Sequence, residues 1–106
     1  MTKFLIKACY APDGVKGVLK VGGSNRRQAV KNMLEGLGGK MESFYYAFGD
    51  YDVYSIGELP DTISAAALGL TINASGLASV SITVLLDPEE IDKAAHLSVN
   101  YRMPGN

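Results

Sequence analysis

The sequence predicts one α+β domain over residues 1–106, with elements in the order β-α-β-β-α-β followed by a short C-terminal helix and a tail. Four runs, at residues 3–10, 41–48, 51–59 and 77–86, alternate apolar with polar side chains at the period of a strand. Two runs between them have apolar residues at helical spacing. We therefore expect a four-stranded antiparallel sheet with two helices on one face.

The first half of the chain predicts a strand, a connector and a helix. Residues 11–14, Ala-Pro-Asp-Gly, are typical of a turn, and residues 15–23 are expected to form a connector with room for one helical turn. Ser24 is suited to cap the helix that follows, and Gly38 with Gly39 ends it. Arg26 is expected to lie off the apolar stripe of this helix. That stripe consists of Val30, Met33, Leu34 and Leu37.

The next two strands are predicted to form a tight hairpin. Gly49 and Asp50 fit a two-residue type II′ turn, because this turn needs a positive φ at its first central position. Such a turn pairs Tyr45 with Tyr54. It also separates an apolar face from a polar one. The apolar face would hold Phe44, Tyr46, Phe48, Tyr51 and Val53, and the polar face Tyr45, Asp52 and Tyr54.

The second helix, residues 62–74 with Asp61 or Thr62 as its cap, has no charged residue and is apolar on all sides. Such a helix is usually buried on all sides, so we expect a second copy of the chain to cover its outer stripe. After the last strand, Asp87 caps a short helix whose first residue is Pro88. The rest of the chain, to residue 106, is expected to be irregular.

This order of elements is typical of the ferredoxin-like fold, in which helices cover one sheet face and leave the other open. Alternation assigns one set of polar side chains to the open face, and the tail is expected near the mouth of a pocket there. The predicted ligand-binding residues are Lys7, Cys9, Tyr45, Asp52, Tyr54, Ser81, Thr83, Tyr101 and Arg102. An open face of this size is expected to be covered by a second copy or by the C-terminal segment.

Several motifs resemble those of the GYD-domain family of small bacterial proteins. They are the run Gly49-Asp50-Tyr51-Asp52-Val53, the Pro60-Asp61 cap before an Ala-rich helix, Gly38-Gly39-Lys40, and the closing Tyr101-Arg102-Met103-Pro104-Gly105. The resemblance runs nearly end to end. It implies a ferredoxin-like fold related to dimeric α+β barrels, and it implies no settled activity. The implied fold is also akin to that of amino-acid-sensing regulatory domains. The chain has no room for the helix-turn-helix that usually accompanies those domains, so a DNA-binding regulator is not expected.

Composition narrows the possible partners. Ten Lys and Arg against eleven Asp and Glu give a net charge of -1, without the basic footprint of a nucleic-acid-binding protein. Residues 62–86 lack charge but carry too many Ser, Thr and Asn for a membrane span. A single cysteine, Cys9, excludes an internal disulfide, and no secretory signal is evident, so a cytoplasmic location is expected. One His and one Cys do not make a recognisable metal-ligand set, and no cofactor is predicted.

Asp52 and His96 are the candidate catalytic residues. On an open face, Asp52 could anchor a ligand or act as a base, or it could pair with Lys7 or with backbone near the hairpin. His96 could move a proton near neutral pH, or cap the end of its helix. Arg102 could fork onto a carboxylate or a phosphate. Its segment is expected to form a lid over the pocket, an interchain strut or a frayed end.

The favoured interpretation is a homo-oligomer, at least a dimer, that binds a small organic molecule without catalysis. One alternative is a cofactor-free enzyme of the dimeric-barrel kind, in which Asp52 or His96 transfers a proton. Another is a structural assembly subunit with no ligand.

Overall fold

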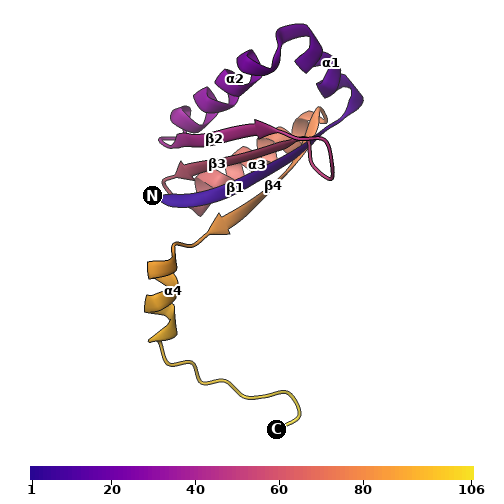
Figure 1. Cartoon of the computed structure of the whole chain (residues 1–106). Helices are drawn as coiled ribbons and strands as arrows, with labels where there is room; N and C mark the ends of the chain where they lie inside the picture. The colour runs from indigo at the N-terminus through magenta and orange to yellow at the C-terminus, as the bar shows by residue number, and fades with distance from the viewer.

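A computed structural model describes all 106 residues and contains four strands and four helices (Figure 1). In chain order these are β1 (Thr2–Tyr10), α1 (Pro12–Val21), α2 (Gly23–Gly36), β2 (Lys40–Tyr46), β3 (Val53–Leu59), α3 (Thr62–Ser75), β4 (Ala78–Leu85) and α4 (Pro88–Ala95).

The strands form one antiparallel sheet in the order β2-β3-β1-β4, so the predicted α+β class and antiparallel sheet are confirmed. The predicted hairpin register is also confirmed, because Tyr45 pairs with Tyr54 and Tyr46 with Val53. The register shifts once along β2, between Met41 and Ser43. β1 is a central strand, paired with β3 on one side and with β4 on the other.

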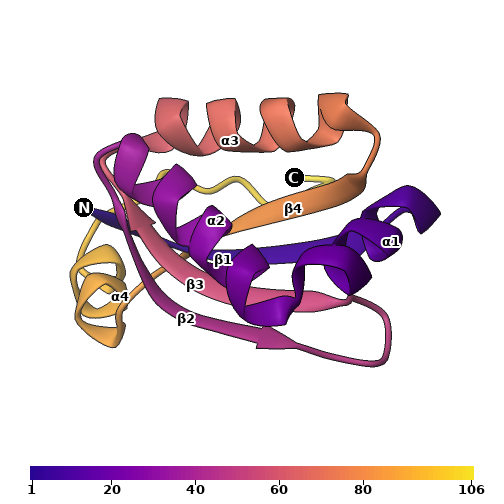
Figure 2. The ribbon, with the colours of Figure 1, turned by 90° about the horizontal axis from the view of Figure 1, so that it is seen from above.

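The core lies between the sheet and its helices, on the face we call the helical face. Phe4 and Ile6 of β1 are buried there against Leu34 of α2 and Leu68 of α3. Because one set of β1 side chains meets both helices, α2 and α3 cover the same face of the sheet (Figure 2). The opposite face, which we call the open face, carries no helix.

The predicted turn and connector after β1 are wrong, because residues 12–21 form helix α1. Pro12 occupies the first turn of this helix, where its missing N–H costs nothing, and Gly22 ends it with a φ of 88°. Gly14 is not a turn residue. A Cβ atom at this position would lie 2.1 Å from the carbonyl oxygen of Leu77, so its lack of a side chain lets α1 approach the start of β4.

The predicted type II′ turn does not form. Gly49 has no positive φ, and strands β2 and β3 end earlier than predicted, leaving residues 47–52 as a loop. Phe48 lies fully exposed in this loop rather than on the apolar face. One hydrogen bond, from the Ala47 N–H to the Asp52 carbonyl at 2.9 Å, continues the hairpin beyond its last ladder pair.

Two of three predicted helix caps are confirmed. The Asp61 carboxylate accepts a hydrogen bond from the Ser64 N–H at 2.8 Å at the start of α3. Asp87 and Glu90 form a complete capping box on α4. Ser24 is not a cap, because α2 begins one residue earlier and Gly22 stands at the N-cap without a side-chain hydrogen bond.

Helix α3 presents one apolar stripe to the core and another to the outside. Ala65 and Leu68 are buried, whereas Ile63 is 79% exposed and Leu70 is 73% exposed. Within one chain the helix is therefore covered on one side only. Coverage of the outer stripe by a second copy stays a prediction.

Helix α4 and the tail, residues 87–106, extend away from the sheet, and we call this segment the arm (Figure 1). α4 has no buried residue. The whole chain measures 57 × 32 × 23 Å and has a radius of gyration of 16.9 Å. A compact domain of this length has a radius of about 13 Å, so the arm lies outside the compact body.

The outer edge of β4 is blocked by a side chain of α3. The Asn73 amide accepts a hydrogen bond from the Val80 N–H at 2.7 Å and donates one to the Val80 carbonyl at 3.3 Å. A neighbouring strand would make the same pair of bonds at this position.

Substituting Gly14 tests the close approach of α1 to β4. Gly14→Ala should lower the free energy of unfolding by about 1–3 kcal/mol, because its methyl group would overlap the Leu77 carbonyl. Gly17→Ala is the matched control in the same helix, where a Cβ meets nothing within 4 Å. The control should gain up to about 1 kcal/mol from helix propensity. Equal stabilities of the two variants in urea denaturation would contradict the packing described.

Candidate functional site

A row of polar side chains crosses the open face over all four strands. Lys7 of β1 pairs with Tyr54 of β3 on one side and with Ser81 of β4 on the other, and Tyr54 pairs with Tyr45 of β2. Directly paired residues of antiparallel strands project on the same face, so these four side chains form one row. The structure thus brings together four of the predicted site residues.

Tyr51 joins this row, contrary to its predicted place on the apolar face. The Lys7 Nζ atom lies 4.6 Å from the centroid of the Tyr51 ring, which is within the range of a cation–π contact. The Tyr51 and Tyr54 rings meet edge to face with centroids 5.9 Å apart. Because no tight turn forms, Tyr51 is free of the strand alternation that the prediction assumed.

Asp52 is bound to the end of β1 rather than to Lys7. Its Oδ2 atom accepts a hydrogen bond from the Tyr10 N–H at 2.8 Å, and its own N–H donates to the Ala8 carbonyl at 2.8 Å. Pairing with backbone near the hairpin was one of the alternatives that the sequence predicted for Asp52, and it gives the side chain a structural role. The Oδ1 atom has no hydrogen-bond partner within the chain and can accept one from a ligand.

The remaining predicted residues of the body border this row. Thr83 pairs with Leu5, next along β1 and β4. The Cys9 thiol, half-buried, donates a hydrogen bond to the Asp50 carbonyl at 3.2 Å. Cys9 thereby ties the loop to β1, which is a structural use of the thiol.

Ion pairs occupy the other end of the open face. Lys3 Nζ lies 3.1 Å from Glu42 Oε2, and Lys40 Nζ lies 3.1 Å from Glu58 Oε2. A hydrogen bond from Lys40 holds the pKa of Glu58 below its usual range. Hydrogen bonding and charge attraction from Glu42 raise the pKa of Lys3. Lys7, by contrast, has no acidic partner and is the unpaired cation of this face.

The structure does not bring the predicted residues of the arm to this row. His96 is the C-cap of α4, and Tyr101 and Arg102 are exposed in the tail beyond it. The Arg102 side chain bonds only to the carbonyl of Asn106. The expectation that the tail lies at the pocket mouth is therefore not met within a single chain.

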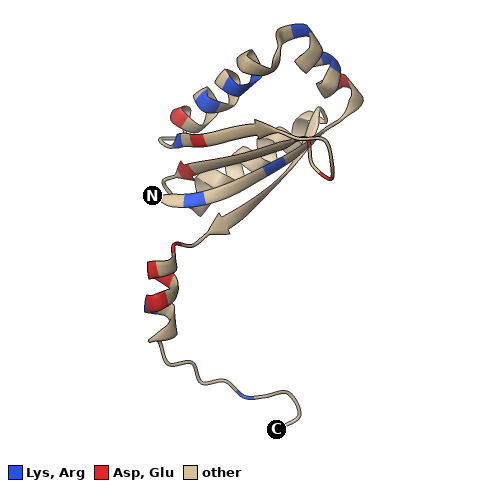
Figure 3. Cartoon of the chain, in the orientation of Figure 1, with Lys and Arg blue, Asp and Glu red and all other residues tan.

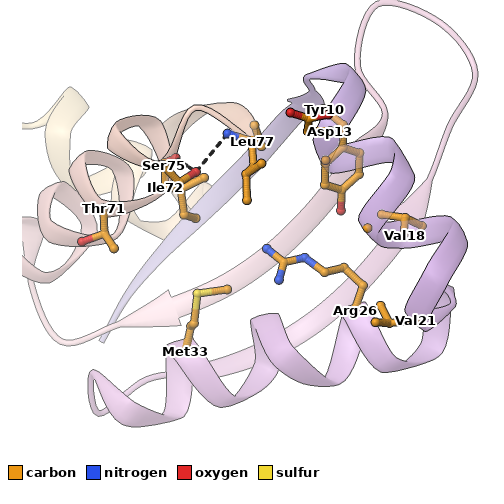
Figure 4. Close-up of a pocket in the computed structure, with 13 residues that line it drawn as sticks. Tyr10, Asp13, Val18, Val21, Arg26, Met33, Thr71, Ile72, Ser75 and Leu77 are labelled. Carbon is orange, nitrogen blue, oxygen red and sulfur yellow. Dashed lines mark hydrogen bonds between the residues drawn. The ribbon is translucent and has the colours of Figure 1, made fainter.

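A cavity of about 380 Å³ lies on the helical face, where no site was predicted (Figure 4). It opens between the α1–α2 pair and the end of α3, and Tyr10 and Arg26 project into it. Sequence reasoning placed Arg26 off the apolar stripe of its helix. Val30 follows Arg26 by four residues and Met33 follows Arg26 by seven, so Arg26 continues the stripe, and this spacing was the available signal.

Tyr46 reaches from β2 to the start of α2, next to this cavity. Its hydroxyl donates a hydrogen bond to the Gly23 carbonyl at 3.2 Å. Burial raises the pKa of Tyr46, and the neighbouring Tyr10 hydroxyl raises it further, whereas Arg26 and Arg27 oppose both effects. The pKa of Tyr46 therefore reports on the charge and polarity at this end of the cavity.

Charges are distributed unevenly over the elements (Figure 3). Residues 12–36, which include α1 and α2, carry five Lys and Arg against two Asp and Glu, and residues 87–95 carry four Asp and Glu against one Lys.

No group of three or more His, Cys, Asp or Glu side chains is placed to hold a metal ion. None of the four helices combines the length and apolar character needed to cross a lipid bilayer.

The fold and these residues define a small α+β domain with a tyrosine-rich polar row on an uncovered sheet face. The chain belongs to the GYD domain family, whose family model matches residues 4–95. The resemblance of the Gly49–Val53 run and its flanking motifs is thus confirmed. The match includes the open-face row and the helical cavity, and it ends before His96 and the tail. No curated protein and no solved structure matches the chain.

Removing the Asp52 carboxylate tests its structural role. Asp52→Ala should lower the free energy of unfolding by about 1–3 kcal/mol, because the Tyr10 N–H loses its acceptor. Asp52→Asn keeps an acceptor oxygen and should lose much less. The measurements are urea denaturation and hydrogen exchange of the Tyr10 amide. Equal stability of the two variants, with unchanged exchange, would show that this hydrogen bond does not hold β1.

The ionisation of Tyr46 provides a test by pH. Its folded pKa is raised, so its contribution to stability is complete below the ordinary value of about 10 and is lost as pH rises through the folded pKa. In an NMR titration of ¹³Cζ-labelled tyrosine, Tyr10→Phe should lower the pKa of Tyr46 and Arg26→Gln should raise it. Shifts of the same sign in both variants would contradict the arrangement described.

Proposed function

We propose that this GYD-domain protein is a homo-oligomer that binds a small organic molecule over the open face of its sheet and does not transform it. The observation that carries this proposal is the row of Tyr45, Tyr54, Lys7 and Ser81 across all four strands, with the Tyr51 ring in contact with Lys7 and edge to face with Tyr54. Aromatic walls with a few fixed polar groups are typical of small-molecule sites.

The row offers complementary polar groups to such a ligand. Lys7 has no acidic partner, and Oδ1 of Asp52 accepts no hydrogen bond from the chain. A donor on Lys7, which lies over the Tyr51 ring, and an acceptor on Asp52 therefore remain free. Within one chain this face is uncovered, so a closed chamber requires a second copy.

The arm supports association between copies. The arm extends away from the compact body of its own chain. Exposed apolar residues alternate with polar ones along it, at Leu97, Val99, Tyr101 and Met103. This period-two pattern is typical of a segment that packs one side on an apolar surface. We infer that the arm lies against a neighbouring copy and that Tyr101 and Arg102 reach the chamber from there.

The alternative of a cofactor-free enzyme has less support. One oxygen of Asp52 is bound to the Tyr10 amide, so this carboxylate already has a structural task. His96 lies at the exposed end of α4, outside the family match. We therefore favour binding over proton transfer. The alternative of an assembly subunit with no ligand does not account for the unpaired Lys7 ammonium or the free Oδ1 atom of Asp52.

We also infer a ferredoxin-like arrangement, supported by the strand order β2-β3-β1-β4 and by the common face of α2 and α3. Helix α1 is then an addition between the first strand and the first helix of that pattern. A cytoplasmic location is supported by the single cysteine, Cys9, whose thiol is free.

Native mass spectrometry of the protein purified from its own host tests both parts of the proposal. We expect a dimer or a larger assembly that carries a small molecule. Asp52→Asn should lower the bound fraction because it removes a charged acceptor, whereas Asp50→Asn, in the same loop, should leave it unchanged. A chain shortened to residues 1–86 should assemble less well because it lacks the arm.

A monomer at micromolar concentration would contradict the proposed assembly. A stable assembly without any small molecule would support the alternative of a structural subunit and would contradict ligand binding.

A further inference from the structure

A cavity within the chain lies on the side of the sheet opposite to the open-face row. The cavity of about 380 Å³ is lined by α1, α2, the end of α3 and the start of β4 and is open on one side (Figure 4). Its walls are largely apolar, with Val18 and Val21 from α1, Met33 from α2, Ile72 from α3 and Leu77 from the connection to β4. A volume of this size is at the lower end for small-molecule sites.

Arg26 places a positive charge in these apolar surroundings without a counter-charge. The three ion pairs of the chain are Lys3–Glu42, Lys16–Asp13 and Lys40–Glu58, and none includes Arg26. Its guanidinium points into the cavity and makes no hydrogen bond to the chain (Figure 4). A half-buried charge is costly unless a partner balances it, so the site favours uptake of an anion.

The acidic residue at the cavity does not supply that partner. Asp13 lies at the rim, with a largely exposed side chain that pairs with Lys16 at 3.8 Å. The surrounding helices add to the positive potential, since residues 12–36 carry five basic residues against two acidic ones (Figure 3). Charge complementarity at this cavity is therefore directed toward an anionic ligand.

Tyr10 supplies a second polar group next to Arg26. Its side chain enters the cavity from the end of β1 (Figure 4). The Ser75 hydroxyl at the cavity is already used, because it donates to the Ile72 carbonyl and accepts from the Leu77 N–H. A guanidinium fork and a phenol hydroxyl can together bind both oxygens of a carboxylate.

We propose that this cavity binds a small amphipathic monocarboxylate, whose carboxylate pairs with Arg26 and the Tyr10 hydroxyl and whose apolar body lies against Val18, Met33, Ile72 and Leu77. The apolar walls favour a ligand with a hydrocarbon or aromatic part, and the unpaired guanidinium of Arg26 favours a ligand with a negative charge. This site lies within one chain, so it requires neither the oligomer nor the open-face row.

The test uses octanoate and benzoate as probes, with octanol as a neutral analogue, in NMR titrations of the full chain. Octanoate should shift the methyl resonances of Met33 and Val18 and leave those of Leu5 and Thr83 on the open face unchanged. Arg26→Gln should weaken octanoate binding by about tenfold or more, because it removes a charge-assisted pair. Binding of octanol should change little in the same variant.

Arg27→Gln is the matched control, because it removes the same charge from the next position of α2 and this residue does not line the cavity. It should change the affinity for octanoate by less than about threefold, the effect of a screened, more distant charge. Arg26→Lys keeps the charge but loses the fork and should bind with intermediate affinity.

Three outcomes would overturn the proposal: no response to millimolar octanoate or benzoate, equal losses in Arg26→Gln and Arg27→Gln, or resonance shifts confined to the open face. Lys7→Gln, which removes the unpaired cation of the open face and does not touch the cavity, should leave octanoate binding unchanged. Failure of this site and failure of the open-face site are therefore distinguishable.

Discussion

The end of β1 is held in place by hydrogen bonds on both of its sides, and both candidate sites depend on that anchoring. On one side the Tyr10 N–H donates to Asp52 at 2.8 Å, and on the other the Ala11 N–H donates to the Leu77 carbonyl at 2.9 Å. The chain then enters α1 at once, because Pro12 is already in the first helical turn. Lys7 is thereby fixed on the open face, and the Tyr10 side chain is fixed in the cavity of the helical face. One strand end positions residues of two separate sites.

The elements that depend on local chemistry could be predicted from the sequence. Alternation alone assigned Lys7 and Tyr54 to one face, and the pairing of Tyr45 with Tyr54 followed from the place of the loop, although the turn type was wrong. The caps at Asp61 and Asp87 were predicted because a side-chain oxygen next to free backbone N–H groups is a short-range interaction. Once the face of each strand and the pairing of the strands are predicted, most residues of the open-face row follow.

The features that depend on long-range contacts could not be predicted. Gly14 was predicted to lie in a turn, and only the Leu77 carbonyl, distant in sequence, explains why a glycine lies inside α1. Tyr51 left the strand pattern because Gly49 did not adopt the left-handed conformation that the tight turn needs. The helical cavity depends on how α1 and α3 pack, so the importance of Arg26 became evident only from the structure.

The amide of Asn73 has a consequence for how copies of the chain can meet. β4 is an edge strand of eight residues without a charge, rich in valine, isoleucine, serine and threonine. Such an edge readily adds a foreign strand, and repeated addition leads to aggregates. By occupying both backbone groups of Val80, Asn73 interrupts the hydrogen-bonding template in the middle of this edge. The sheet is thereby protected from open-ended growth by strand addition at β4.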